Sequence, residues 1–370
     1  MLTKIEITNF KSFNEKFTFD LSKTNSFEFN KECIRDGIVN KAIIYGHNGC
    51  GKSNLGFAIF DIISHLTDKE FLSDNYKNYF NANSNSKYVT FSFEFKFEDN
   101  IVQYTYTKSD YQTLISEKLM INDEEFAYID KNKSTIFRTT AKGAETLKND
   151  LNDSNISILS YISKNALLEK NDTNKVFEIF KKFIHNMLYF RSLIDGHSYM
   201  GYEQGGHDID HEIVKKGNLT NFEKFLNDAG IKCNLITKEM NGINKLFFKF
   251  KNKEIEFFSI ASSGTKALAA FYFFYQRLQN DNVQFLFIDE FDAFYHHDLS
   301  ALIIEKLKQL TDTQIILTTH NTSIISNTLL RPDCYFLMDN NKITALKDRT
   351  HKELREAHNI EKMYRAGSFE

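Results

Sequence analysis

The stretch AIIYGHNGCGKSN, residues 42–54, constrains the fold of this chain more than any other part of the sequence. A short apolar run that reads as a buried strand opens into a glycine-rich turn, and a helical pattern follows directly. The turn matches G-x-x-x-x-G-K-[ST] at all four fixed positions, from Gly46 to Ser53. Chance matches usually lack this strand and helix context, so the pattern predicts a phosphate-binding loop rather than an incidental glycine turn.

The chemistry of such a loop follows from its backbone. Its N–H groups point inward at one anion, and the positive end of the helix dipole faces the same charge. Lys52 is then expected to reach the β- and γ-phosphates, and the Ser53 hydroxyl is expected to bind magnesium. The residues predicted to bind nucleotide here are Gly46, His47, Asn48, Gly49, Cys50, Gly51, Lys52, Ser53 and Asn54.

A second part of a nucleotide site is predicted at FLFIDE, residues 285–290, where four apolar residues precede two carboxylates. A fully buried parallel strand would deliver Asp289 at its end to hold magnesium through water. Glu290 would then polarise the water that attacks the γ-phosphate. An apolar run that ends in Asp-Glu is a weak signal alone, but it becomes strong beside a complete phosphate loop.

QIILTTH, residues 314–320, predicts another buried strand, which ends at His320. A histidine at a strand end is usually structural or exposed, so its position must carry the argument. The helical pattern 299–310 lies between this strand and FLFIDE. Strand, helix and strand form a right-handed crossover, which places His320 beside Asp289 at the carboxyl edge of one parallel sheet, where nucleotide sites form.

The segment IASSGTKALAAFYFFY, residues 260–275, is a turn of small residues that opens into an apolar helix. A helix N-terminus with bare amides and hydroxyls at Ser262, Ser263 and Gly264 is a second candidate anion site. It would be redundant on a monomer that already has a phosphate loop. Ser262 or Ser263 is also predicted to cap the helix, and that role holds in either case.

Composition sets the class of protein but not its partners. The 370 residues carry a formal charge of −3, with 42% hydrophobic and 26% charged residues, which is ordinary globular composition. This balance gives no global attraction to nucleic acid. The four cysteines include no C-x-x-C pair, which argues against a zinc ribbon or a disulfide framework. No stretch approaches the length of a membrane span, so we expect a cytoplasmic protein without membrane contact.

The remaining patterns predict the other elements. The stretch 156–163 reads as a short apolar element of undefined type. The predicted strands are 2–8, 16–21, a hairpin within 87–110, a further pair within 113–138, and 232–237, 245–250, 253–258, 334–338 and 343–346. The predicted helical segments are 54–66, 140–153, most of 173–230, the stretch after 262–265, 299–310 and 351–367.

Five motifs occur in an order that resembles one superfamily. They are I-x-I-x-N-F-K-S-F (Ile5 to Phe13), the phosphate loop, S-S-G-T before a helix, the strand ending in Asp-Glu, and T-T-H. This order is similar to that of ABC-type ATPases of the SMC, RecF and OLD-like group. The likeness covers most of the chain, and it is strongest to short bacterial ATP-binding proteins of abortive-infection and other anti-phage systems.

The resemblance implies a mechanism. In that group the serine-glycine turn closes on the γ-phosphate bound by the other subunit, so that two ATP molecules lie inside a head-to-tail dimer. Carried over, Ser262 and Gly264 would act in trans. Relatives usually have a glutamine near the magnesium and often a glycine where Ser263 stands, and this chain has no convincing equivalent of either, so we expect slow hydrolysis. The residues expected to act in cis are Lys52, Ser53, Asp289, Glu290 and His320, with catalysis assigned to Lys52, Glu290 and His320.

The implied fold class is α/β: an ABC-type P-loop ATPase head with a mixed N-terminal β lobe, a parallel-sheet core and a helical insertion. The expected divisions are 1–139 for the N-terminal ATPase lobe, 140–230 for the insertion, 231–333 for the C-terminal ATPase lobe, and 334–370 for a hairpin and a charged helix.

The resemblance favours a nucleotide-driven dimeric switch that uses ATP and magnesium. Its role would be sensor or scaffold in anti-phage defence, with an effector such as a nuclease encoded nearby. One alternative is a RecF- or SMC-like DNA-binding ATPase. Another is a nuclease or toxin in its own right, for which Arg349, Glu353 and His358 are the candidate trio, although a mixed-charge helix is usually a solvated face. A transporter subunit is less favoured, because L-S-G-G-Q is absent.

Overall fold

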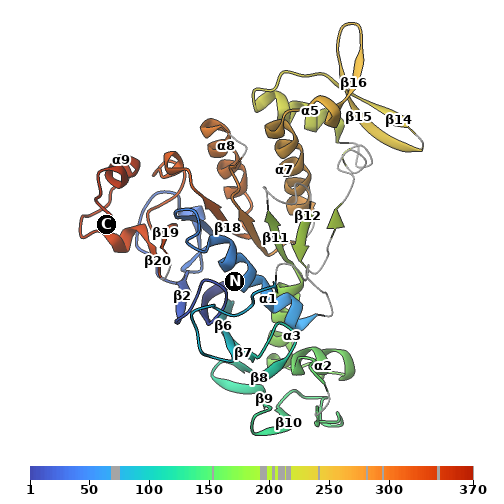
Figure 1. The fold of residues 1–370 in the computed structure, drawn as a ribbon, viewed down its shortest axis with the longest axis vertical. Helices are drawn as coiled ribbons and strands as arrows, with labels where there is room; N and C mark the ends of the chain where they lie inside the picture. The colour runs from blue at the N-terminus through green and yellow to red at the C-terminus, as the bar shows by residue number, and fades with distance from the viewer. Residues whose placement is uncertain are drawn as a thin grey trace.

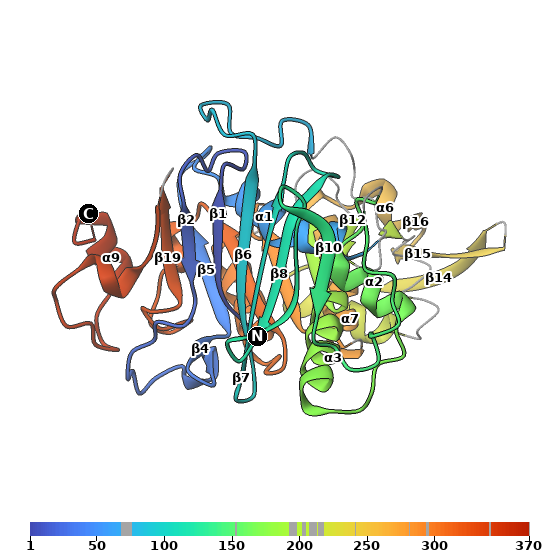
Figure 2. The ribbon, with the colours of Figure 1, turned by 90° about the horizontal axis from the view of Figure 1, so that it is seen from below.

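Two large β-sheets and the helix between them make up the body of the molecule (Figure 1). The computed structural model describes residues 1–67, 76–151, 154–191, 198–201, 205–206, 213, 218–240, 242–280, 282–293, 296–339 and 342–369. Viewed from below, the antiparallel sheet lies in front of the core sheet (Figure 2). Apolar side chains from both sheets and from the intervening helix form one hydrophobic core.

The antiparallel sheet is built from strands whose residues alternate between buried and half-buried positions, as expected when one face covers a core. Its tight turns fall at Glu98-Asp99 and at Asn122-Asp123, where Glu98, Asn122 and Asp123 have positive φ. The hairpins predicted within 87–110 and 113–138 are thereby confirmed. The strands, in spatial order, are β10 (Ser134–Thr139), β9 (Glu124–Asp130), β8 (Leu114–Ile121), β7 (Asn100–Lys108), β6 (Val89–Phe97), β1 (Leu2–Thr8) and β2 (Phe17–Asp20).

The core sheet holds the phosphate-loop strand. Five of its strands run parallel, in the order β11, β17, β18, β5 and β19, and antiparallel strands extend both edges. Every residue of β5, β17 and β18 is buried, because helices and the second sheet cover both faces. The strands are β13 (Gly205–Gly206), β12 (Ser198–Gly201), β11 (Met187–Arg191), β17 (Phe285–Asp289), β18 (Gln314–Thr319), β5 (Lys41–Tyr45), β19 (Tyr335–Asp339) and β20 (Lys342–Ala345).

Helix α1 follows the phosphate loop and lies between the two sheets (Figures 1 and 2). It approaches the core sheet closely at Gly56, where an added Cβ would lie 2.9 Å from the Phe287 ring and 3.2 Å from that of Tyr189. The helices are α1 (Lys52–Leu66), α2 (Ile158–Asn165), α3 (Asp172–His185), α5 (Leu219–Asp228), α6 (Phe257–Ile260), α7 (Ser263–Asn280), α8 (His297–Lys308) and α9 (Ile360–Arg365).

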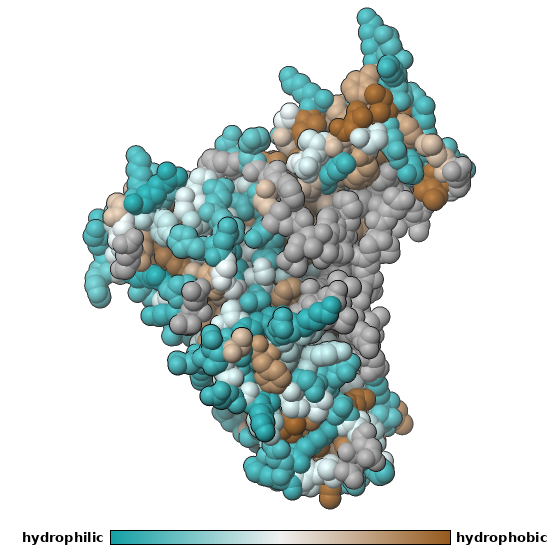
Figure 3. All heavy atoms as spheres, viewed as in Figure 1, coloured by the Kyte–Doolittle hydropathy of each residue, from teal (hydrophilic) through white to brown (hydrophobic). Residues whose placement is uncertain are grey.

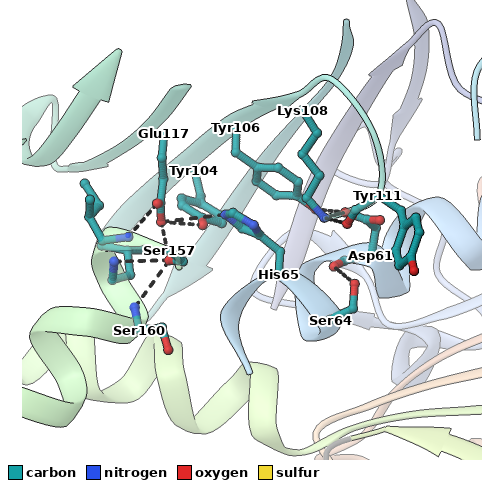
Figure 4. Close-up of polar contacts among 12 residues, drawn as sticks. Asp61, Ser64, His65, Tyr104, Tyr106, Lys108, Tyr111, Glu117, Ser157 and Ser160 are labelled. Atoms are coloured by element: carbon teal, nitrogen blue, oxygen red, sulfur yellow. Dashed lines mark hydrogen bonds and ion pairs between the residues drawn. The ribbon is translucent and has the colours of Figure 1, made fainter. Parts of the chain in front are cut away.

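A buried ion pair joins α1 to the antiparallel sheet (Figure 4). Lys108 Nζ of β7 lies 2.8 Å from Asp61 Oδ2, and both side chains are 2% exposed or less. The hydroxyls of Tyr79 and Tyr106 each donate to the same carboxylate at 2.9 Å. Because a buried charge needs both a partner and hydrogen bonds, this arrangement fixes the orientation of α1 against the sheet.

A second buried carboxylate, that of Glu117 on β8, lies near α1 one helical turn after Asp61 (Figure 4). Glu117 of β8 accepts hydrogen bonds from Tyr104 Oη at 2.7 Å, Ser157 Oγ at 2.6 Å and the Ile158 backbone N–H at 2.7 Å. His65 Nε2 of α1 lies 3.8 Å from Glu117 Oε1. Burial alone would raise the pKa of the Glu117 carboxyl, but the contacts with its neighbours have the larger combined effect and lower that pKa. Burial lowers the pKa of His65.

A small antiparallel sheet projects from the upper end of the molecule in Figure 1. Helices α5 and α6 lie at its base (Figure 1), and α7 runs from there back toward the core sheet. Its strands are β14 (Leu235–Met240), β15 (Ile243–Lys249) and β16 (Glu254–Glu256). A separate two-stranded ladder joins β3 (Ile34–Arg35) and β4 (Ile38–Val39).

Several secondary-structure predictions are wrong. Residues 140–151 form turns rather than a helix, with Gly143 at φ +91°. Within 173–230, β11 is a strand of the core sheet, so this interval is less helical than predicted. The charged helix predicted over 351–367 shrinks to α9. The predicted strand 253–258 ends early, because α6 begins at Phe257. The predicted turn at residues 340–341 lies outside the described residues, and the domain boundaries stay a prediction.

Candidate nucleotide site

The phosphate loop connects β5 to α1 at the carboxyl edge of the core sheet. Its flanking residues Gly46 and Cys50 are buried, whereas the residues 47–49 are exposed. Gly51 precedes the helix with φ +104°, and a Cβ there would lie 2.7 Å from Ser12 Oγ. A side chain at this position would therefore be strained and crowded, which explains the glycine.

Lys52 is folded against its own loop. Its Nζ donates to the backbone oxygens of Gly46 at 2.8 Å and His47 at 3.1 Å. Burial lowers the pKa of Lys52, while the nearby carboxylates of Asp289 and Glu290 act in the opposite direction. The ammonium thus lies at the centre of the loop, next to the two carboxylates predicted to act with it.

Both carboxylates follow strand β17. Asp289 is 3% exposed and accepts a hydrogen bond from Thr318 Oγ1 at 2.6 Å. The same Thr318 hydroxyl oxygen accepts the Glu290 backbone N–H at 2.8 Å. Glu290 adopts a left-handed conformation with φ +48°, which costs a non-glycine residue about 1 kcal/mol or more and turns its side chain out of the strand direction. Thr318 therefore contacts both the carboxylate of Asp289 and the backbone of Glu290.

His320 connects Lys52 to Glu290. Lys52 Nζ lies 3.3 Å from His320 Nδ1, and His320 Nε2 lies 3.3 Å from Glu290 Oε1. An ammonium can only donate, so this arrangement assigns Nδ1 as the acceptor and Nε2–H as the donor to the carboxylate. Lysine, histidine and glutamate thus form one connected chain of polar contacts, whereas the motif spacing predicts only that His320 lies beside Asp289.

Three residues that sequence reasoning assigned no role support this site. Thr319 Oγ1 donates to Asp292 at 2.7 Å, and burial raises the pKa of Asp292. Ser12 accepts a hydrogen bond from Asn54 Nδ2 at 2.9 Å, which attaches the N-terminal turn to the start of α1. The signal for Thr319 and Asp292 was present in the sequence, because both stand beside residues of recognised motifs.

The residues could hold a hard cation. Asp289 is the last residue of β17, and Ser53 lies in the first turn of α1, directly after the phosphate loop. Magnesium commonly takes one or two protein oxygens, with phosphates and water for the rest, so a carboxylate and a hydroxyl suit it. Among the residues that the structure describes, no group of three or more His, Cys, Asp or Glu side chains forms a metal site.

The serine-glycine turn lies away from the phosphate loop. Ser262 and Ser263 are exposed at the start of α7, beside the projecting sheet, whereas α1 occupies the middle of the molecule (Figure 1). Ser262 Oγ accepts the Thr265 N–H at 3.2 Å and contacts Thr265 Oγ1 at 2.9 Å, so the predicted capping role is confirmed. Within one chain the structure does not bring this turn to Lys52.

The C-terminal trio is not assembled. Arg349 hydrogen-bonds Leu337 O and Asp339, and Glu353 pairs with Arg355. His358 Nδ1 accepts the Arg355 backbone N–H at 3.2 Å. Each member therefore has a separate partner, and the contacts give no shared centre to these three side chains.

Fold and site together define the class of protein. The phosphate-loop strand β5 is separated from the Asp-Glu strand β17 by the histidine strand β18, and an antiparallel sheet covers α1. This is the arrangement of an ABC-type P-loop ATPase head.

The family follows from comparison with known proteins. The model of the family described as "AAA domain, putative AbiEii toxin, Type IV TA system" matches residues 41–326, which is more than half of the chain. The chain belongs to this family of ATPases. No curated protein matches it.

Solved structures show the same fold. An SMC head bound to the C-winged helix domain of ScpA has a TM-score of 0.51 and 17% identity, over 94% of this chain and 99% of that chain. The SMC head domain from Thermotoga maritima gives 0.47 and 14%, over 93% and 98%. An SMC head with an extended coiled coil, bound to the C-terminal domain of ScpA derived from Pyrococcus furiosus, gives 0.47 and 15%, over 94% and 97%. The first of these structures confirms the predicted fold class.

The described residues include no helix long and apolar enough to cross a membrane.

Proposed function

We propose that this chain is a magnesium-dependent ATPase whose two copies close head to tail around ATP. One observation carries the proposal: Lys52, Glu290 and His320 form a connected polar chain, while the Ser262 turn is exposed beside the projecting sheet at the start of α7. A helix N-terminus with exposed hydroxyls suits a phosphate that a second copy presents. Head-to-tail pairing through a two-fold axis then completes two sites.

The site residues have distinct proposed roles. Lys52 neutralises the β- and γ-phosphates, and Ser53 with Asp289 holds magnesium. Glu290 polarises the attacking water, and the His320 Nε2–H that faces it keeps the carboxylate in place. Magnesium supplies charge neutralisation on the phosphates when it is bound.

The first experiment measures oligomeric mass with and without ATP and magnesium. Glu290→Gln keeps the shape of the side chain but removes the base, so we expect it to bind ATP and remain as the closed dimer. Lys52→Ala is the matched control that should stay monomeric with ATP. If wild type, Glu290→Gln and Lys52→Ala each have the same oligomeric mass with and without ATP, the closure mechanism is refuted.

A mixing experiment tests the trans role directly. Ser262→Arg blocks the turn and Lys52→Ala blocks the phosphate loop, so each variant alone should be inactive. Mixed head-to-tail dimers contain one intact composite site, which predicts recovery of about one quarter of wild-type activity in an equal mixture. Ser259→Arg, an equally exposed serine on α6, controls for the added charge. No recovery on mixing would show that each site works within one chain.

For the biological role, we propose a sensor or scaffold in bacterial anti-phage defence that works with a separate effector such as a nuclease. The support is the family description, which names a putative toxin and a toxin–antitoxin system. The test is phage plating on cells that carry the gene with its neighbours. Protection should vanish with Lys52→Ala and with deletion of one neighbouring gene. Protection that survives Lys52→Ala would exclude an ATP-dependent sensor.

Binding of DNA is a second candidate function, which one surface favours. The hairpin between β15 and β16 exposes Lys249, Lys251 and Lys253, and none of them pairs with a described carboxylate. Phe250 is 50% exposed among them, on the projection where Figure 3 shows hydrophobic atoms surrounded by hydrophilic ones. An exposed aromatic ring between lysines suits the stacked bases and phosphates of a single strand.

Fluorescence anisotropy with a single-stranded DNA oligonucleotide tests this surface. Alanine at the three lysines should weaken binding strongly at low salt, whereas arginine at the same positions should retain it. Equal affinities for the two variants would exclude the hairpin as a DNA-binding surface.

A further inference from the structure

A partly open pocket lies where the end of α1 meets α2 and α3. Its volume is about 490 Å³, within the range of small-molecule sites. Leu66, Leu159, Phe180 and Ile184 form its apolar wall. The nucleotide site is elsewhere, because Leu66 ends the helix that Lys52 begins. The pocket is therefore a separate space within the ATPase head.

The wall of the pocket also includes one hydroxyl, that of Ser160. Ser160 is 5% exposed, and its backbone N–H donates to Ser157 Oγ at 3.3 Å. Figure 4 shows its own Oγ directed away from Ser157. Because Ser160 lines the pocket, its hydroxyl is available to donate a hydrogen bond to a polar group bound there.

The described titratable residues that line the pocket are all basic. Its described lining includes Lys164, Lys181 and His185, and no acidic residue. Glu178, which contacts Lys181 Nζ at 2.9 Å, is absent from this lining. Burial, followed by the charge of Lys181, lowers the pKa of His185. An apolar wall with a basic rim suits a molecule that has an apolar body and one anionic group.

We propose that this pocket binds a small organic anion with an apolar body, either a carboxylate or a phosphate ester. The body packs against Leu66 and Phe180, the anionic group meets Lys181 at the rim, and Ser160 Oγ donates a hydrogen bond. The site is independent of the proposed dimer, because all its lining residues come from one chain.

Its position couples it to ATP. Leu66 is the last residue of α1, and Ser160 lies in the first turn of α2, which Ser157 and Glu117 attach to β8. A ligand that contacts both helices fixes the far end of α1 relative to that buried carboxylate. Because the same helix begins at Lys52, ligand binding and ATP binding should affect each other reciprocally.

Three naphthalene compounds test the proposal by calorimetry on the intact protein: naphthyl phosphate, naphthylacetate and the neutral naphthylethanol. We expect at least one anion to bind about tenfold or more tightly than the alcohol, since one such contact is worth roughly 1.4 kcal/mol. The tighter of the two anions identifies the headgroup. Equal affinity for the anions and the alcohol, or no binding at millimolar concentration, overturns the proposal.

Variants locate the binding. Lys181→Met should abolish the preference for the anion, whereas Lys182→Met, an exposed lysine on the same helix, should leave it unchanged. Ser160→Ala should weaken binding severalfold with unchanged far-UV circular dichroism. An anion that binds Lys181→Met as tightly as wild type occupies another site, which also overturns the proposal.

The ATPase assay tests the coupling on its own. The anion that binds more tightly should change the apparent affinity for ATP about fivefold or more in wild type but not in Lys181→Met. Binding in the pocket with no effect on ATP affinity would refute the coupling. Failure of the dimer experiments above would leave the calorimetry with the naphthalene compounds valid, because the lining of the pocket comes from one chain.

Discussion

The buried pair of Asp61 and Lys108 allows a prediction with a defined magnitude. In Lys108→Met, Asp61 keeps two tyrosine hydroxyls but loses its counter-charge at a position with 0% exposure. Removing one partner of such a pair costs about 3–5 kcal/mol. Because domains are stable by only about 5–15 kcal/mol, the variant should unfold at a clearly lower urea concentration, as followed by far-UV circular dichroism.

The double variant Asp61→Asn, Lys108→Met removes both charges together. If the cost of Lys108→Met comes from an uncompensated charge, the double variant should be more stable than the sum of the two single changes predicts, with a coupling of about 1–3 kcal/mol. Additive single changes, or a cost below about 1 kcal/mol for Lys108→Met, would refute the reasoning.

Further predictions concern the site and its surroundings. Burial lowers the pKa of Lys41 from 10.5 to about 8, so between these pH values the unfolded chain binds a proton that the folded chain does not. The free energy of unfolding of wild type should therefore rise by about 3 kcal/mol relative to that of Lys41→Met as the pH increases from about 8 to 10.5. Urea titrations at several pH values measure this difference. Cys50 is buried and burial raises its pKa, so mass spectrometry should find it unmodified after brief N-ethylmaleimide treatment of native protein at pH 7, and modified after denaturation. Gly51→Ala should lose ATP binding in calorimetry because its Cβ would meet Ser12; retained binding would contradict this. His320→Ala should lower kcat by about tenfold or more with little change in ATP affinity, because it removes the donor to the catalytic carboxylate; an equal loss in both would assign it to binding.

The nucleotide site could be predicted from the sequence because its parts are local. The strand, turn and helix around Lys52 are contiguous, and so is the buried strand that ends at Asp289. Strand β11 was missed, since a short apolar run directly after a helix has no periodicity to separate it from that helix. Its strand character comes from pairing with β17, which is remote in sequence.

The buried polar residues were also missed, although the sequence carried a signal for them. Lys108 follows Val102, Tyr104 and Tyr106 at alternate positions of one strand, so the period of two places it on the inward face. Glu117 likewise alternates with the buried residues Leu119 and Ile121 of β8, so the same period places it on the inward face. Their partners on α1 and α2 could not be foreseen, because those contacts depend on how two sheets pack around one helix.

The order of strands in the core sheet has a consequence for synthesis. Strand β5 is made early, yet its two neighbours are β18, residues Gln314–Thr319, and β19, residues Tyr335–Asp339. Until these segments leave the ribosome, both edges of a strand that is fully buried in the folded protein stay unpaired, and unpaired edges invite association with other chains. The nascent chain therefore carries its nucleotide loop on an open strand for most of translation, and chaperone binding should be heaviest before residue 314 emerges.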